Sequence, residues 1–246
     1  MKITLPNGKK VDLDKGIDIS IPLSNDEKNP LAWYVKPPRF EPVMEDGWIG
    51  SVKKGGAVNF RNIFFNPHGH GTHTECLGHI TPEVYSINQR LDQFFFEAVL
   101  FTVTPKQLGN YRVVQADQLK SLLEYTAIEV LILRTLPNPV DKKSMNHSST
   151  NPPYMDTDCL EILNQLGVNH FMIDLPSVDP ESDDGKLAFH HGFWEVPENP
   201  RHDKTITELI YVPNEVEDGH YFLNLQVAPF ENDAAPSRPV LFTMKS

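Results

Sequence analysis

One stretch restricts the folding of this chain more than any other, residues 66–80, which read NPHGHGTHTECLGHI. It places four of the ten histidines and one carboxylate within a dozen residues: His68, His70, His73, Glu75 and His79. Glycines at 69, 71 and 78 allow the backbone to turn sharply, so these side chains can converge on one point. Pro67 and the two Gly-His pairs disfavour a helix here. The fold must therefore hold an irregular, histidine-rich segment in a defined place.

The residue types in this stretch predict a metal site. If residues 73–79 are extended, side chains alternate, and His73, Glu75 and His79 share one face. Imidazole and carboxylate ligands suit Zn²⁺ or Mn²⁺, and a ligand set with few thiolates favours an open, catalytic site over a structural one. The alternative is a surface loop that binds metal only adventitiously. Such histidine-rich tracts seldom interleave Gly, Thr and Glu so tightly.

The stretch also resembles a known signature, HxGTHxDxPxH, of the cyclase and kynurenine formamidase family of hydrolases. Gly71-Thr72-His73 matches the GTH, Glu75 stands at the position of the family's Asp, and His79 matches the final His. Leu77 replaces the proline of the motif.

The first histidine of the signature is displaced, because Gly69 occupies its position between His68 and His70. We predict His68 as the first ligand, since Gly69 and Gly71 can absorb an added residue as a bulge without disturbing His73. The competing assignment makes His70 the ligand. In our prediction His70 lines the substrate pocket instead.

Further matches to the family follow in order from Asp18 to Leu241. IDLPSVDP at 173–180 resembles a family element close to the active site, which implies that Asp174 and Ser177 bind substrate. Asp179 in the same element is interpreted as part of a turn before Pro180. The His-His pair in KLAFHHGFW, at 186–194, offers His190 as the family's distant histidine. The segment ENDAAPSRPVL resembles the family's closing Asp-x-x-Pro-x-Arg.

Length and composition narrow the classes of protein. A chain of 246 residues with 39% hydrophobic content can form one large domain, and we treat residues 1–246 as a single domain. The net charge of −11 argues against nucleic acid or an anionic membrane surface as a partner. Two cysteines make no disulfide framework, and the first residues lack the apolar run of a signal peptide. We expect a cytoplasmic protein.

Periodicity predicts an α/β fold. Strands are expected at 17–23, 57–65, 94–103, 128–135, 170–176, 206–212 and 219–229. Helices are expected after Asp117 and after Asp156 or Thr157, the second ending at Gly167. A strand, a helix and a strand at this spacing make a crossover unit with parallel strands. Residues 24–56 read as loops and short strands that form one wall of a pocket. The family resemblance adds mixed β strands wrapped as a partial barrel, with helices packed outside, and a homodimer.

These observations favour a metal-dependent hydrolase that cleaves an amide, ester or lactone bond of a small molecule, similar to an arylformamidase. His68, His73 and Glu75 would hold a divalent ion, and a second ion would add His190 and Glu208. Glu208 qualifies because a carboxylate inside an apolar strand needs a partner. His79 is the expected general base and acid.

Two alternatives remain open from the sequence. His68, His70 and Glu75 have the spacing of the first half of a cupin motif, which would indicate an iron dioxygenase or a sugar-binding barrel. A metal-binding but catalytically silent family member is the other. The sequence does not select the substrate, the metal or the number of ions.

Overall fold

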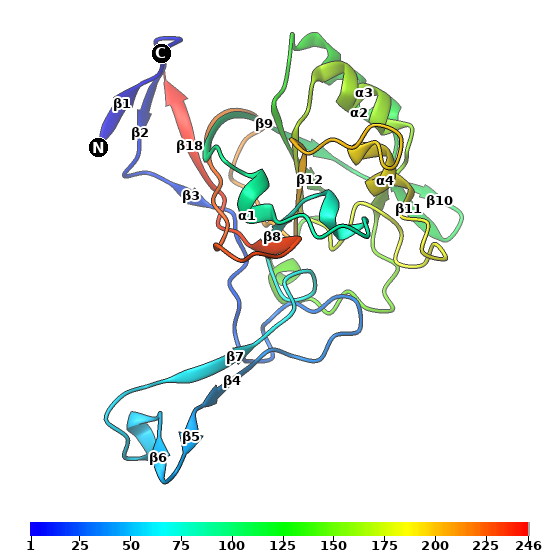
Figure 1. The fold of residues 1–246 in the computed structure, drawn as a ribbon. Coiled ribbons are helices and arrows are strands. Elements are labelled where there is room, and N and C mark those ends of the chain that lie inside the picture. Colours follow the sequence, from blue (N-terminus) through cyan, green and yellow to red (C-terminus); the bar gives the residue numbers. More distant parts are fainter. Residues whose placement is uncertain (246) are drawn as a thin grey trace.

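The computed structural model describes residues 1–245, and four parallel strands form the centre of its largest sheet (Figure 1). In spatial order these are β9 (Phe95–Val103), β12 (Val130–Thr135), β14 (His170–Ile173) and β15 (Thr205–Glu208). Val130 is in register with Ala98 on one side and His170 on the other. Every residue of β12 is buried, as its unbroken apolar sequence predicts.

Antiparallel strands extend this parallel centre in both directions. The sheet has eleven strands, in the order β1-β2-β18-β16-β9-β12-β14-β15-β8-β17, with β3 pairing β18. The added strands are β1 (Lys2–Thr4), β2 (Lys10–Asp12), β3 (Ile17–Asp18), β8 (His73–Glu75), β16 (Gly219–Asn224), β17 (Ala234–Pro236) and β18 (Val240–Lys245). The predicted mixed α/β fold is confirmed. Within residues 1–245 the end strands β1 and β17 do not pair with each other, so the sheet is not a closed barrel.

The predicted crossover unit is present. Helix α3 (Cys159–Leu166) connects β12 to the parallel strand β14 and buries Ile162, Leu163 and Leu166 against the core. Gly167 ends α3 in the left-handed region, with φ 77°, as the sequence predicts. Asp158, and not Asp156 or Thr157, occupies the position before the helix, and its side chain makes no capping bond there.

The helix expected after Asp117 is shorter than predicted. It is a single turn, α2 (Ala116–Leu119), followed by the 3₁₀ segment η3 (Lys120–Glu124). Gln115, and not Asp117, occupies the N-cap position, and its backbone N–H donates to the side-chain oxygen of Gln118. The Asp117 carboxylate instead accepts from the ammonium of Lys106.

Several predicted strands end early for identifiable reasons. The strand expected at 206–212 stops at Glu208, because Leu209 has φ 54° and leaves the extended conformation. The strand expected at 17–23 is regular only at Ile17–Asp18. Beyond it, the backbone of Ile19 donates to Pro239 and accepts from Tyr211, and the carbonyl of Ile21 accepts from the backbone N–H of Thr72.

Residues 39–64 form an arm that projects from the rest of the molecule (Figure 1). Its base pairs β4 (Arg39–Pro42) with β7 (Arg61–Phe64), and its tip pairs β5 (Met44–Glu45) with β6 (Trp48–Ile49). All four residues of β7 are exposed. Residues 24–56 line two separate cavities: Trp33 lines one in the body of the molecule, and residues 44–49 line another at the tip of the arm.

The remaining elements are short. They are η1 (Val52–Lys54), η2 (Leu77–His79), α1 (Ile87–Arg90), β10 (Lys106–Leu108), β11 (Tyr111–Val114), η4 (Val140–Ser144), β13 (Tyr154–Met155) and α4 (Ala188–Trp194). No helix within residues 1–245 combines the length and the apolar character needed to span a bilayer.

Candidate metal and active site

Strand β8 brings the histidine-rich segment into the sheet, between β15 and β17. His73 is in register with Glu208, and Glu75 with Ile206 and Ala234. Because side chains alternate along a strand, His73 and Glu75 point to one face, and the cross-strand partner Glu208 shares that face with His73. The strand ends at Glu75, and His79 follows in the 3₁₀ segment η2, so residues 73–79 are not extended throughout as expected.

The first group of ligand atoms surrounds one oxygen of Glu75. His68 Nδ1 lies 3.0 Å from Glu75 Oε2, and ligand atoms of His68, His73 and Glu75 lie within 4.8 Å of one another. His73 Nε2 is 3.4 Å from Glu208 Oε2. Within residues 1–245, the buried atoms His73 Nε2 and Glu75 Oε2 have no hydrogen-bond partner. Buried polar atoms are rarely left so, and lone pairs that face a common point fit a metal ion.

The second group surrounds the other oxygen of Glu75. His190, on helix α4, places Nε2 at 3.0 Å from Glu75 Oε1 and 3.8 Å from Glu208 Oε1. The other ring nitrogen, Nδ1, lies 2.5 Å from Asp179 Oδ2. Asp179 also accepts from the backbone N–H of Phe189 and of His190, so it fixes both the helix start and the ring. Glu75 can therefore contribute one oxygen to each group.

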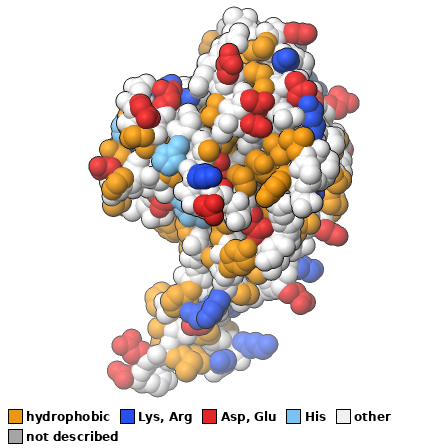
Figure 2. All heavy atoms as spheres, turned by 90° about the vertical axis from the view of Figure 1, so that its right-hand side faces the viewer, with side chains coloured by type: hydrophobic (Ala, Val, Ile, Leu, Met, Phe, Trp, Pro, Cys, Tyr) orange, Lys and Arg blue, Asp and Glu red, His pale blue; other side chains and the backbone are white. Residues whose placement is uncertain are grey.

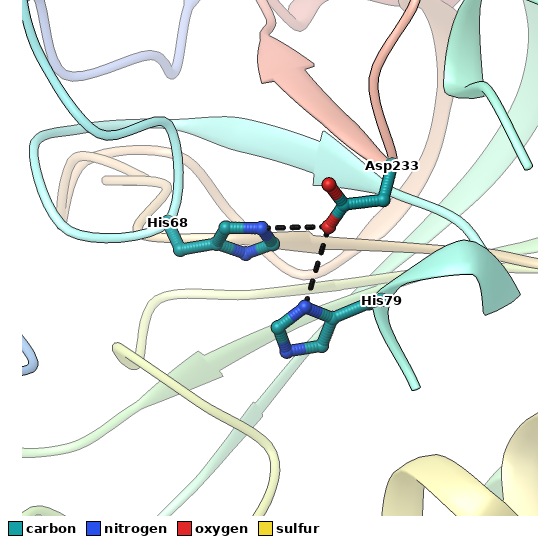
Figure 3. A group of neighbouring side chains, drawn as sticks. All are labelled: His68, His79 and Asp233. Carbon is teal, nitrogen blue, oxygen red and sulfur yellow. Dashed lines mark hydrogen bonds and ion pairs between the residues drawn. The ribbon is translucent and has the colours of Figure 1, made fainter. Parts of the chain in front are cut away.

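His79 and Asp233 form the outer side of the cluster (Figure 3). One oxygen of Asp233, Oδ2, lies 2.8 Å from His68 Nε2 and 3.3 Å from His79 Nδ1. His79 Nε2 lies 3.9 Å from Glu75 Oε2. The His79 side chain is 29% exposed, whereas Glu75 is fully buried, so His79 connects the cluster to the surrounding space.

The carboxylates give the cluster a strongly negative potential. Burial by itself lowers the pKa of His68 and of His190, but hydrogen bonds to and charges of the neighbouring carboxylates raise each pKa to about 10. Burial likewise raises the pKa of Glu75, yet the charge on His79, the hydrogen bond from His190 and the nearby His68 imidazole hold that pKa well below its usual value. The cluster thus favours positive charge, which a divalent cation supplies in exchange for protons.

A cavity of about 310 Å³ opens onto the cluster. Trp33, Ser177 and Leu187 line it, together with His68, His79, His190 and Glu208. A cavity of this size suits a small molecule rather than a polymer.

Comparison with known proteins identifies the family of this chain. Residues 17–180 match the model of the cyclase family. The chain belongs to the cyclase family.

Curated relatives cover nearly all of this cyclase-family chain. A kynurenine formamidase from Bacillus thuringiensis (strain Al Hakam) is 27% identical over 238 residues, which span 92% of this chain and 96% of the relative. A kynurenine formamidase from Bacillus anthracis is 27% identical over 240 residues, with 92% and 97% coverage. These relationships make the protein a hydrolase.

Solved structures share the fold. A predicted metal-dependent hydrolase from Bacillus stearothermophilus superposes with a TM-score of 0.65 at 16% identity, covering 93% of this chain and 98% of that one. An isatin hydrolase bound to the product analogue thioisatinate superposes with a TM-score of 0.66 at 13% identity, covering 94% and 93%.

The structure brings together most of the residues singled out from the sequence of this cyclase-family protein. His68, His73, Glu75, His79, His190 and Glu208 converge, and Ser177 lines the adjoining cavity. Cys76 follows Glu75 in the chain but is buried, and its thiol points to the carbonyl oxygen of Tyr85.

His70 and Asp174, both predicted to bind substrate, do not line the cavity beside the cluster. Hydrogen bonds to other protein groups occupy the polar atoms of both side chains. His70 Nδ1 accepts from the backbone N–H of Asn66, and Nε2 donates to the carbonyl of Lys36. It lines a different cavity, of about 510 Å³. Asp174 is buried against the backbone and hydroxyl of Thr135 and the ammonium of Lys142. With His70 turned away, the cupin set of His68, His70 and Glu75 does not form.

Sequence reasoning missed two carboxylates at the site. The turn predicted at Asp179 is present, because its backbone N–H donates to Ser177 Oγ, but its carboxylate also contacts His190. The available signal for that contact is the position of Asp179 in the family element next to Ser177. Asp233 carried no role, although it is the Asp of the closing segment that resembles the family's.

Proposed function

We propose that this protein is a metal-dependent hydrolase that cleaves an amide, ester or lactone bond of a small molecule, with activity similar to that of kynurenine formamidase. The observation that carries the proposal is a pair of buried atoms, His73 Nε2 and Glu75 Oε2, that have no hydrogen-bond partner among residues 1–245 and lie close to His68 Nδ1. The names of the relatives favour amide substrates, because kynurenine formamidase and isatin hydrolase both refer to amide hydrolysis.

His68, His73 and Glu75 are the proposed ligands of a first divalent ion. Glu75 Oε1, His190 and Glu208 would hold a second ion, and Zn²⁺ and Mn²⁺ both suit these nitrogen and oxygen ligands. A bound divalent ion would supply a Lewis acid that polarises a carbonyl and lowers the pKa of a coordinated water to about 7.

His79 is the proposed general base and acid. Its Nδ1 faces Asp233, so Nε2 is the ring nitrogen left to take a proton from the attacking water and return it to the leaving group. The ring borders both Glu75 and the cavity, which supports a role in proton transfer to a substrate bound there. No nucleophilic Ser or Cys is required.

The side chains that line the cavity would select the substrate. Trp33 offers an aromatic face and Leu187 an apolar contact, while Ser177 offers a hydroxyl for a polar group of the substrate. An aromatic N-formyl amine or a cyclic amide has the size and the mixed character that this wall accommodates.

The deciding experiment measures metal content and turnover together. Protein purified without chelators should contain a divalent transition metal by elemental analysis and should hydrolyse members of a panel of N-formyl arylamines, cyclic amides and lactones. His73→Ala should remove most of the metal, whereas His220→Ala, at an exposed position of β16, should not. Metal-free wild-type protein would refute the proposal. Metal binding without turnover on the panel would favour the catalytically silent alternative.

We also propose a homodimer in the cytoplasm. Buried, free Cys76 and Cys159 are compatible with a reducing compartment. The arm at residues 39–64 supports self-association, because it exposes Trp48, Phe60 and Ile63. Figure 2 shows hydrophobic side chains on the surface of the projecting arm. Monomers rarely present so many large apolar side chains together.

The dimer proposal has its own test. Light scattering on the eluting protein should give twice the chain mass of 27.9 kDa. Replacing Phe60 and Ile63 together by Ser should shift the protein toward the monomer without altering its circular dichroism. Wild-type protein that elutes as a monomer at micromolar concentration would refute the dimer.

A further inference from the structure

Asp233 reaches the cluster from a part of the chain remote from the histidine-rich segment. It lies 165 positions after His68 and directly precedes β17, the neighbour of β8 in the sheet. Its own carbonyl accepts from the backbone N–H of Cys76, and the next residue, Ala234, is in register with Glu75. The backbone therefore fixes the Asp233 side chain relative to the proposed ligands.

A single carboxylate oxygen lies beside two imidazole rings (Figure 3). Oδ2 of Asp233 is 2.8 Å from His68 Nε2 and 3.3 Å from His79 Nδ1. The two rings stack with their centroids 4.2 Å apart. An ionised carboxylate only accepts hydrogen bonds, so His68 Nε2 carries the proton of its hydrogen bond to Asp233. The approach of His79 Nδ1 to the same oxygen as an ion pair favours a proton on that nitrogen as well.

That arrangement determines the state of the opposite nitrogen in each ring. With the proton on Nε2, a neutral His68 presents a lone pair at Nδ1, which lies 3.0 Å from Glu75 Oε2. With the proton on Nδ1, a neutral His79 presents a lone pair at Nε2, the atom nearer Glu75. One oxygen thus orients a ligand and a base together.

We propose that Asp233 is a positioning residue that fixes the ring orientation and tautomer of both His68 and His79. This inference rests on the proposed function. A carboxylate that accepts from the remote N–H of a metal-bound histidine orients that ring, and its loss typically weakens metal affinity 10–100-fold. Here one carboxylate would orient two histidine rings.

A competing role for Asp233 is that of a direct ligand, since its oxygen, His68 Nε2 and His79 Nδ1 lie close enough to hold an ion themselves. The contacts of His68 favour positioning. Its Nε2 contact with Asp233 has the geometry of a hydrogen bond, whereas its Nδ1 faces the side on which, within residues 1–245, His73 Nε2 and Glu75 Oε2 have no partner. The nitrogen that faces unpartnered ligand atoms is the one that a metal would use.

The variant that tests this is Asp233→Asn, which keeps the shape but offers one acceptor and an NH₂ group. The neutral amide oxygen is a weaker acceptor than a carboxylate oxygen, and the NH₂ group cannot accept from either ring. The affinity for Zn²⁺, measured by competition with a chelating dye, should fall 10–100-fold. Turnover at saturating Zn²⁺ should also fall at least 10-fold through kcat, with KM changed less than 3-fold.

A spectroscopic readout tests the tautomers directly. In Zn²⁺-loaded protein with ¹⁵N-labelled histidine, the ring nitrogen shifts should show His79 protonated at Nδ1 in the wild type and a different proton distribution in Asp233→Asn. Glu231→Gln is the matched control, because it removes a carboxylate two residues away that bonds Asn88 and Gln89 and no histidine. It should behave as wild type in all three measurements.

The outcomes are separable. Asp233→Asn with wild-type Zn²⁺ affinity and an unchanged His79 tautomer overturns the inference. Complete loss of bound Zn²⁺ in Asp233→Asn at concentrations that saturate the wild type makes Asp233 a ligand and also overturns it. Asp233→Glu guards against misfolding, since it retains the acceptor and should keep the His79 tautomer; a changed tautomer there counts against positioning. A wild-type protein that binds no Zn²⁺ defeats the proposed function itself.

Discussion

Glu75 is the residue at which the two halves of the site meet. One oxygen faces His68 and the other bonds His190. The family signature has Asp at this position, and the extra methylene of Glu lengthens the arm that spans the two groups. Full burial of Glu75 means that its charge must be compensated by protonated imidazoles or by bound cations.

At the same scale, His79→Ala separates proton transfer from metal binding. The variant should keep its metal, because His68, His73 and Glu75 remain, yet lose turnover by about 10²–10⁴-fold, the usual contribution of a general base. Elemental analysis and initial rates on the same preparation check this. Metal lost in parallel with activity would make His79 a ligand.

Two short helices, α4 and α3, hold elements of the site and of the central sheet in place. Helix α4 carries His190 and begins where Asp179 accepts from two of its backbone N–H groups. Helix α3 supports the parallel strands from outside, and its end at Gly167 returns the chain to β14. Both helices are short, so their terminal contacts contribute much of their stability.

Gly167→Ala tests the end of α3. An alanine at φ 77° places Cβ in a strained conformation, which should lower the free energy of unfolding by about 1–2 kcal/mol. Urea denaturation measures the change. Gln165→Ala, an exposed position in the same helix, should stay within about 0.5 kcal/mol of wild type. Equal stability of both variants would mean that the chain relaxes at residue 167.

The sequence predicted those strands and ligands that are defined by residues close together in the chain. Apolar runs predicted β9, β12 and β14, and the spacing of the GTH segment brought attention to His73 and Glu75. Partners that meet only through tertiary structure carried no such signal, as with Asp179 and His190 or Asp233 and His68. Strand ends were missed where one backbone angle decides them, as at Leu209.

The whole molecule contains buried histidines that make its stability depend on pH. Burial lowers the pKa of His147 and of His170 to about 4, with a contribution from the charge of Lys142 at His147. Both titrate near 6.5 in an unfolded chain. Between pH 6.5 and 4 the unfolded state therefore binds protons that the folded state does not, so stability present above pH 6.5 is lost as the pH falls.

We predict that the free energy of unfolding falls between pH 7 and pH 4.5, with each of these histidines contributing at most roughly 3 kcal/mol. His170→Gln should show a smaller fall than wild type by about 1–3 kcal/mol, because Gln carries no proton to gain. Urea denaturation at the two pH values measures both. An identical fall in the two proteins would assign the acid sensitivity to other groups.

The position of β8 between β15 and β17 has a consequence for the order in which the protein becomes functional. A nascent chain that has emerged as far as residue 230 already contains every proposed ligand, but it lacks Asp233 and β17, one of the two strands that pair with β8 at Glu75. Contacts between segments so far apart in the chain form late, since they require closure of long loops. The arrangement around β8 is therefore completed only after residue 236 has left the ribosome, and ion capture would follow the pairing of these strands rather than guide it.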